Sequence, residues 1–275
     1  IKTGYELLLS PERDVPSIML FAGLRFTMAG ILTVIIYSIA RRKLLYPAKK
    51  ESAAYIGILA LFQTVLQYIF FYLGLSLTAG VKGTVISGSS TFFAILIAAW
   101  ILRQEKLSFK KMSGCVIGFA GILILNIGGG GGGHFTMLGD GMIILNALCS
   151  SFAGLMTRGL GKRVDVFVGT GYSLAIGGAL LIIPGLIMGG TLPCITIMGL
   201  IYLLLLIAIS ALGFALYNKL LSCNPVGKVA IFNSLIPVVG AITSCLCLNE
   251  VFYWKYIIAA TLATSGVYII NKGKK

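Results

Sequence analysis

Long apolar runs separated by short polar segments organise this chain. The runs cover residues 17–40, 54–78, 81–102, 109–127, 139–161, 166–188, 196–221, 226–248 and 253–271. At a rise of about 1.5 Å per residue, each run can cross the roughly 30 Å of hydrocarbon in a bilayer. None alternates between apolar and polar positions in the way that is typical of a lipid-facing barrel strand. The pattern therefore predicts nine membrane-spanning helices.

Composition agrees with this interpretation. Hydrophobic residues make up 58% of the chain and charged residues 11%, and the mean hydropathy is +0.99. A soluble domain carries about 25% charged residues, so most of this surface must face lipid. We expect an all-α polytopic membrane protein whose partners include the lipid bilayer.

Basic residues concentrate in alternate loops of the predicted topology. Only Arg13, Lys82 and Lys255 fall on the other face. By the positive-inside rule, the basic face and the C-terminus are expected to be cytoplasmic, in a bacterial inner membrane. This topology and the attraction of anionic headgroups explain the net charge of +14, so no nucleic-acid partner is expected. The basic face holds Arg41, Arg42, Lys43, Lys49, Lys50, Arg103, Lys106, Lys110, Lys111, Arg158, Lys162, Arg163, Lys219, Lys228, Lys272, Lys274 and Lys275.

The chain contains a degenerate internal repeat. A shift of 145 positions places Glu105 on Glu250 (250 − 105 = 145) and Ser89 on Ser234. An odd number of predicted helices separates the two copies, so the repeats have opposite orientations, as in many secondary transporters. We expect a first repeat at residues 1–127, a glycine-rich linker at 128–138 and a second repeat at 139–275. If each repeat has five helices, the first lacks most of its opening helix.

The repeated motifs resemble a known family. GLRFTMAG at 23–30, YLGLSLTAGVKGTVISGSS from Tyr72 and YNKLLSCNPVGKVAIFNSLIPVVG from Tyr217 are similar to the drug/metabolite transporter superfamily, EamA type. The resemblance implies ten helices in two inverted five-helix repeats, and transport of small metabolites, often export of amino acids. Family members often have a proline in helix 4 and in helix 9. Here Pro237 is present but Phe92 takes the matching position, so we expect helix 4 to be the straighter of the two.

The acidic residues restrict the coupling mechanism. All eight are expected in loops or at helix ends: Glu6, Glu12, Asp14, Glu51, Glu105, Asp140, Asp165 and Glu250. Intramembrane acids are the usual proton relays of transporters, so their absence from the bilayer centre argues against a buried-carboxylate antiporter. The single histidine, His134, is expected to be solvated beside six glycines. No cysteine or histidine spacing indicates a metal site, and no cofactor is expected.

Polar residues within the apolar runs are the candidates for a substrate cavity. Gln63 and Gln67 are four residues apart and would share one helix face, which would be costly to expose to lipid. Small and hydroxyl residues have the alternative role of packing between helices. Arg25 can be a structural anchor paired with Glu6 or a lipid headgroup, or a counter-charge for a substrate carboxylate. The full candidate set is Gln63, Gln67, Ser87, Thr91, Tyr172, Ser210, Tyr217, Asn233 and Arg25.

These features favour a secondary transporter for a small polar or zwitterionic, amino-acid-like metabolite. Export by alternating access is the expected mechanism. A flippase for a lipid-linked headgroup is the alternative; a membrane-embedded enzyme is a weaker one, because no set of Asp, Glu or His converges at the interface. No catalytic residue is expected, and a two-repeat chain can act as a monomer.

Overall fold

The computed structural model describes residues 14–43, 46–47, 49–78, 80–100, 108–126, 135–192, 196–224, 229, 239 and 254–272. The chain divides into two compact units. Unit 1 comprises Ile1–Tyr72 and Met156–Cys223, and unit 2 comprises Leu73–Leu155 and Asn224–Lys275. Each unit therefore takes segments from both halves of the sequence.

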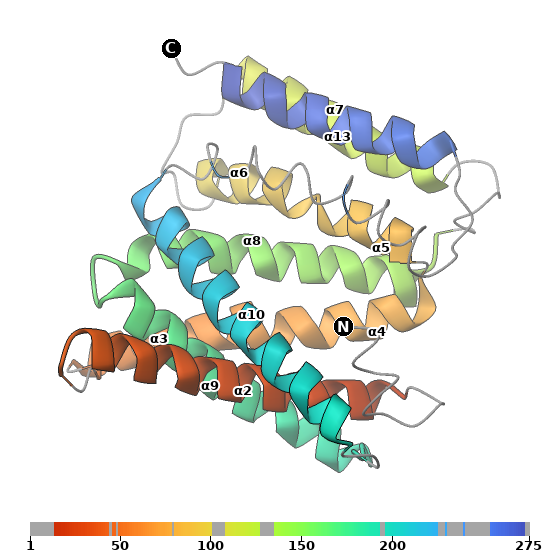
Figure 1. Ribbon diagram of the computed structural model, residues 1–275. Helices are drawn as coiled ribbons and strands as arrows, with labels where there is room; N and C mark the ends of the chain where they lie inside the picture. Colours follow the sequence, from red (N-terminus) through yellow and green to blue (C-terminus); the bar gives the residue numbers. More distant parts are fainter. Residues whose placement is uncertain are drawn as a thin grey trace. The chain divides into compact units, whose positions relative to one another are not determined.

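All regular elements in the described ranges are helices, which confirms the all-α class there (Figure 1). Six are long and apolar enough to cross a membrane: Val15–Ala40, Lys50–Leu77, Lys82–Trp100, Met137–Leu160, Val166–Ile187 and Ile197–Cys223. The predicted run at 226–248 falls almost entirely outside the described residues. The elements are α2 (Val15–Ala40), α3 (Lys50–Ala60), the π-helical segment η1 (Leu61–Leu66), α4 (Gln67–Leu77), α5 (Gly80–Ser87), α6 (Ser90–Trp100), α7 (Phe109–Asn126), the π-helical segment η2 (Met137–Gly141), α8 (Met142–Leu160), α9 (Val166–Ile187), α10 (Ile197–Cys223) and α13 (Trp254–Lys272).

Side-chain caps define the first turns of two of these helices. An Asp14 carboxylate oxygen accepts a hydrogen bond from the backbone N–H of Ser17 at 3.2 Å, at the start of α2. Asp165 accepts from the N–H of Phe167 at 2.9 Å, at the start of α9. Each carboxylate satisfies a donor that the helix leaves unpaired, and its charge is favourable at the positive end of the helix dipole.

In unit 1, α2 packs closely along α9 through glycines on both helices. Gly30 lies against Ala175 and Gly171, and Gly23 lies against Ile182 and the carbonyl of Gly178. A β-carbon at Gly30 would collide with the backbone of α9. Close approach through small residues is the usual way in which membrane helices associate, because lipid provides no hydrophobic force between them.

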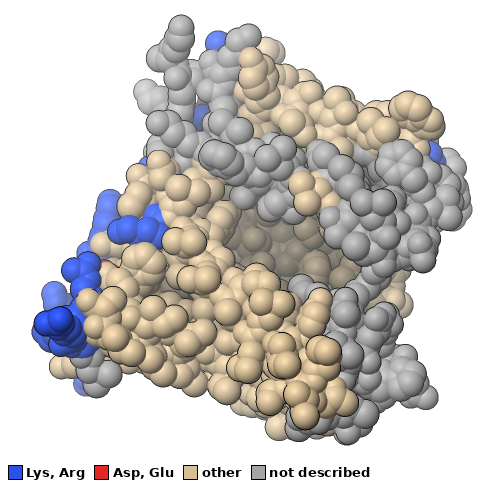
Figure 2. All heavy atoms as spheres, in the orientation of Figure 1, with Lys and Arg blue, Asp and Glu red and all other residues tan. Residues whose placement is uncertain are grey.

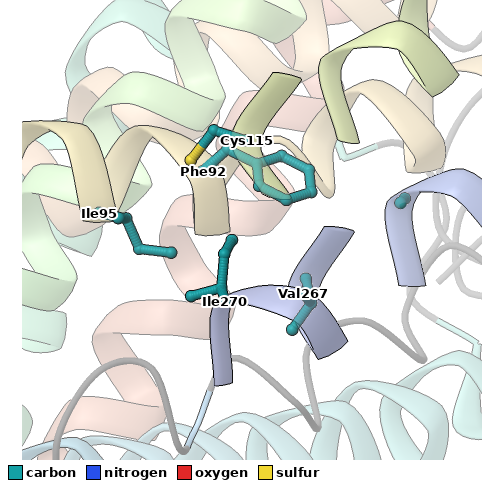
Figure 3. Packing of buried hydrophobic residues seen from close by; sticks show 6 residues of the cluster. Phe92, Ile95, Cys115, Val267 and Ile270 are labelled. Atoms are coloured by element: carbon teal, nitrogen blue, oxygen red, sulfur yellow. The ribbon is translucent and has the colours of Figure 1, made fainter. Parts of the chain in front are cut away.

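In unit 2, α7 and α13 lie side by side (Figure 1). Gly114 contacts the carbonyl of Gly266, and Gly118 contacts the Phe92 ring of α6. The cluster in Figure 3 fills the space among these three helices. Its buried members are Phe92, Ile95, Cys115, Ala263, Val267 and Ile270.

The outer surface of α10 is apolar. Its exposed side chains include Leu204, Ile209, Leu212 and Leu216, each more than half accessible. Such a row would be a large apolar patch on a soluble protein, whereas it suits a helix that faces lipid chains. The described chain is thus a multi-pass integral membrane protein.

The span Lys82–Trp100 is interrupted between α5 and α6. Whether it is straighter than the span at 226–248 stays a prediction, because that span lies almost entirely outside the described residues. Ser89 donates its N–H to the carbonyl of Ile86 at 3.0 Å, three residues back, and the helical pattern resumes when Phe92 and Phe93 both donate to the carbonyl of Ser89. Proline is absent here, and the turn is made by Gly88 and Ser89. Glycine and serine pairs are a recognised cause of helix breaks, because glycine lowers the cost of leaving helical geometry.

Candidate functional site

Arg25 lies well inside α2. The helix begins at Val15, ten residues earlier, so Arg25 is about 15 Å along the axis of a helix of 26 residues. Its side chain is only 4% exposed, and its Cζ atom lies 4.5 Å from the centroid of the Phe26 ring. The Nε atom is buried and has no hydrogen-bond partner among the described residues. Glu6, one of the two partners considered for Arg25 as a structural anchor, lies outside the described residues.

Aromatic rings from two other helices of unit 1 pack around Phe26, the residue next to this arginine. The Phe26 ring centroid lies 4.4 Å from that of Tyr68 on α4 and 5.8 Å from that of Phe214 on α10. Tyr68 in turn lies 5.7 Å from Tyr72. The rings form an apolar layer to which the tyrosines add polar hydroxyl groups. The guanidinium group of Arg25 lies against the Phe26 ring of this layer.

A buried amide network lies in the same unit. Asn218 on α10 donates from Nδ2 to the Thr170 hydroxyl on α9 at 3.0 Å and to the Gln63 carbonyl oxygen at 3.4 Å. All three residues are at most 5% exposed. Gln63 lies in η1, where the π-helical turn changes the direction of its side chain relative to a regular helix; such segments are frequent at functional sites.

The network leaves further polar atoms without partners. Gln63 Nε2 and the hydroxyl of Thr64 are buried and make no hydrogen bond with any described residue. Together with Arg25 Nε, this gives two atoms that can only donate and one hydroxyl that can donate. A buried donor without an acceptor costs about 1–3 kcal/mol. Unit 1 therefore suits a ligand that carries acceptor oxygens, such as a carboxylate.

Unit 2 contains a separate set of buried polar groups. Asn146 on α8 donates to the Ser87 hydroxyl at 3.3 Å, and Ser151 donates to the carbonyl of Ser90 at 2.6 Å. The hydroxyl of Ser89, at the break between α5 and α6, is buried without a partner among the described residues. Thr91 is also buried in this unit.

A buried ion pair among the described residues of unit 2 was not predicted from the sequence. Asp140, expected at a loop or helix end, lies in η2 and pairs with Lys82 of α5 at 2.6 Å. Both side chains are buried. The expectation that no acid lies at the bilayer centre is unaffected, but Asp140 is not a solvated loop residue.

The predicted cavity residues are divided between the units. Arg25, Gln63, Gln67, Tyr172, Ser210 and Tyr217 belong to unit 1, Ser87 and Thr91 belong to unit 2, and Asn233 lies outside the described residues. Tyr217 is 38% exposed, whereas the next residue, Asn218, faces the interior of its unit. The sequence interpretation missed Asn218 and Thr170, although both are polar residues within apolar runs.

Metal chemistry finds no support in the described part of the chain. No group of three or more His, Cys, Asp or Glu side chains comes together there in a way that could hold a metal ion. Cys115 and Cys149 are buried and unpaired, and Cys223 is exposed and unpaired.

Apolar spanning helices with buried polar groups between them define a multi-pass helical membrane protein. The sequence profile of the EamA-like transporter family matches residues 12–127 and 137–272, so the chain belongs to this family. It is a transporter of the drug/metabolite transporter superfamily.

Individual relatives are distant. The uncharacterized transporter YvbV of Bacillus subtilis is 25% identical over 264 residues, covering 94% of this chain and 83% of the relative. The probable amino-acid metabolite efflux pump of Escherichia coli K12 is 27% identical over 219 residues, covering 74% of this chain and 70% of the relative. A protein of known crystal structure superposes with a TM-score of 0.71 at 21% identity, over 92% of this chain and 88% of that one, which shows a shared fold.

Proposed function

We propose that this transporter exports a small zwitterionic, amino-acid-like metabolite across the cytoplasmic membrane by alternating access. In this proposal the basic face and the C-terminus are cytoplasmic. The substrate carboxylate binds at Arg25, and polar groups of the substrate meet Gln63 and Thr64. The name of the Escherichia coli relative, a probable amino-acid metabolite efflux pump, supports this substrate class.

The observation that carries the proposal is the buried, unpartnered Nε of Arg25 near the middle of α2. An arginine on the lipid side near a helix end can extend its charge to the interface, but one that faces the bundle interior needs a counter-charge. A carboxylate provides acceptor oxygens in the geometry that a guanidinium binds best. A substrate that brings its own carboxylate would neutralise Arg25 only when it is bound.

Binding of this kind has a consequence for the transport cycle. The unloaded site would hold an unpaired charge and two unpaired polar groups, whereas the loaded site would be satisfied. A ligand can shift a conformational equilibrium only by its differential affinity for the two states. Neutralisation of the Arg25 charge would give the substrate a different affinity for the two conformations. The inverted repeat in the sequence is the reason to expect an inward-open and an outward-open conformation.

Transport in proteoliposomes tests the proposal, with a panel of amino acids and their amide or decarboxylated analogues. Arg25→Gln is expected to weaken the apparent affinity for carboxylate substrates by roughly 10- to 100-fold, since a hydrogen bond to a charged group contributes about 1.5–3 kcal/mol. Arg25→Lys should retain part of the affinity, because it keeps the charge but loses the planar fork.

The matched control is Lys162→Gln, which removes one exposed cation from unit 1. It should transport as the unmodified protein does. Unchanged affinity for carboxylate substrates in correctly folded Arg25→Gln protein would exclude the proposed role of Arg25, as would equal transport of an amino acid and its decarboxylated analogue.

A further inference from the structure

At one end of unit 1, a tyrosine holds an arginine in a defined position. Arg41, directly after α2, donates from Nε and Nη2 to the Tyr37 hydroxyl oxygen at 3.2 and 3.0 Å. Tyr37 donates its own proton to a carboxylate oxygen of Asp165 at 2.8 Å. The hydrogen bond to Tyr37 raises the pKa of Arg41.

The same tyrosine begins a stack of rings and cations that crosses three helices. Its ring lies over that of Phe167 on α9, with centroids 4.7 Å apart and planes inclined by 28°. Arg41 lies over the Tyr37 ring at 5.4 Å, and Lys219 of α10 lies over the Phe167 ring at 6.0 Å. We call Arg41, Tyr37, Phe167 and Lys219 the cation ladder.

A second arginine is positioned in a similar way nearby in the sequence. The Cζ atom of Arg163 lies 4.8 Å from the centroid of the Tyr55 ring. Tyr55 donates its hydroxyl proton to the carbonyl of Met156 at 2.6 Å, which holds the ring in place. Exposed side chains that pack on rings lose less freedom when they bind an anion than freely rotating ones, because part of their rotamer entropy is already lost.

This end of unit 1 is strongly basic. Figure 2 shows Lys and Arg side chains gathered there, with almost no acidic surface between them. Of the two acids in these segments, Asp165 already caps α9 and accepts from Tyr37, and Glu51 lies in the first turn of α3. The exposed basic residues of this end are Arg41, Arg42, Lys43, Lys49, Lys50, Lys162, Arg163 and Lys219.

We infer that the cation ladder is a built binding site for anionic phospholipid headgroups, whose phosphates bind at Arg41 and at Lys219. The ladder lies at the ends of the apolar spans α2 and α9, where we expect the lipid headgroups to lie. Its charge is complementary to a phosphodiester, and guanidinium groups bind phosphate oxygens well. The inference is independent of the proposed substrate site, because it concerns another part of unit 1.

A general attraction between basic loops and an anionic membrane is the competing explanation. It would depend on the number of charges and not on their positions, and any exposed basic residue would contribute similarly. Lys110, at the start of α7 in unit 2, is also an exposed basic residue but belongs to no such stack. It provides the matched control.

The test compares thermal unfolding of the full chain in phosphatidylcholine nanodiscs with and without phosphatidylglycerol. For the unmodified protein we expect phosphatidylglycerol to raise the unfolding midpoint, because it binds only the folded state. Arg41→Gln and Lys219→Gln should lose this rise, and Tyr37→Phe should reduce it. Lys110→Gln should retain it. Native mass spectrometry should show retained phosphatidylglycerol in the unmodified protein and in Lys110→Gln, and none in Arg41→Gln.

Three results would overturn the inference. One is the absence of any phosphatidylglycerol-dependent rise in the unmodified protein. Another is that Lys110→Gln loses as much of the phosphatidylglycerol-dependent rise as Arg41→Gln does. The third is an equal rise from inorganic phosphate in neutral nanodiscs, which would identify a free anion and not a lipid as the ligand. If Arg41→Gln unfolds in phosphatidylcholine alone, native mass spectrometry of Lys219→Gln replaces it. Loss of bound phosphatidylglycerol from Lys219→Gln would then support the inference, and full retention would overturn it.

Discussion

Lys82 and Asp140 form a buried ion pair within unit 2, with Nζ and Oδ2 2.6 Å apart and side chains 2% and 1% exposed. The pair joins α5 to η2. Asp140 also accepts from the backbone N–H of Thr136 at 3.0 Å and from the hydroxyl of Thr78 at 3.3 Å. Its carboxylate is therefore satisfied by charge and by hydrogen bonds, which is the condition under which buried ions are tolerated.

Removal of one member of this pair should destabilise the protein strongly. We expect Lys82→Met or Asp140→Leu to lower the free energy of unfolding by about 3–5 kcal/mol, because the remaining charge stays buried without its opposite charge at 2.6 Å. The double variant should be much closer to the unmodified protein, since it leaves no unpaired charge. Denaturant unfolding in detergent, followed by circular dichroism, measures these differences. Additive effects of the two single changes would contradict the pairing.

Glycine contacts between α2 and α9 should be sensitive to a single added methyl group. Gly30→Ala is expected to cost about 1–3 kcal/mol, because the β-carbon would push apart the backbones of the two helices. Gly213→Ala on α10 is the control: nothing lies within 4 Å of its added β-carbon, so it should be neutral or slightly stabilising. Thermal unfolding of both variants checks this, and equal effects would contradict the close packing.

The amide network predicts energetic coupling between α10 and α9. A double-mutant cycle with Asn218→Ala and Thr170→Ala should give a coupling energy of about 0.6 kcal/mol, the average for hydrogen bonds between membrane helices. Tyr217→Phe, next to Asn218 but exposed, should show no coupling to Thr170→Ala. The cycle is measured by unfolding in bicelles, and additivity of Asn218→Ala and Thr170→Ala would argue against the hydrogen bond.

Gln67→Ala and Asn233→Ala test the cavity predicted from the sequence. We expect each to lower transport in reconstituted vesicles without loss of folded protein, because each removes an amide proposed to meet the substrate. Initial rates at equal protein amounts provide the measurement. Normal transport by both variants would rule out that cavity.

The orientation of the chain can be tested at Cys223. This thiol is exposed, at the end of α10, whereas Cys115 and Cys149 are buried. With Cys194, Cys245 and Cys247 replaced by Ala, a membrane-impermeant maleimide should label Cys223 in inside-out vesicles and leave intact cells unlabelled. Labelling in intact cells alone would reverse the proposed topology.

Six of the nine predicted spans are long apolar helices in the described residues. Asp14 and Asp165 lie at the helix starts that the apolar runs indicate, and both cap them. The interruption at Gly88 and Ser89 was not predicted, because the absence of a proline at Phe92 indicates a straight helix, whereas a glycine–serine pair can also break one. Among the candidate site residues, Arg25 could be recognised as a charge within an apolar run, but its depth depended on where α2 begins.

The sequence by itself determined the class of this protein: a chain with long apolar runs must satisfy its backbone hydrogen bonds locally, and helices do so without reference to the rest of the fold. Only the tertiary structure decided which polar side chains meet. Asn218 and Gln63 are 155 residues apart, and Lys82 and Asp140 are 58 apart. Contacts of this kind depend on which helices approach one another and at what register. Gly30 on α2 and Gly171 on α9 together determine how closely these two helices approach. No single segment carries that information.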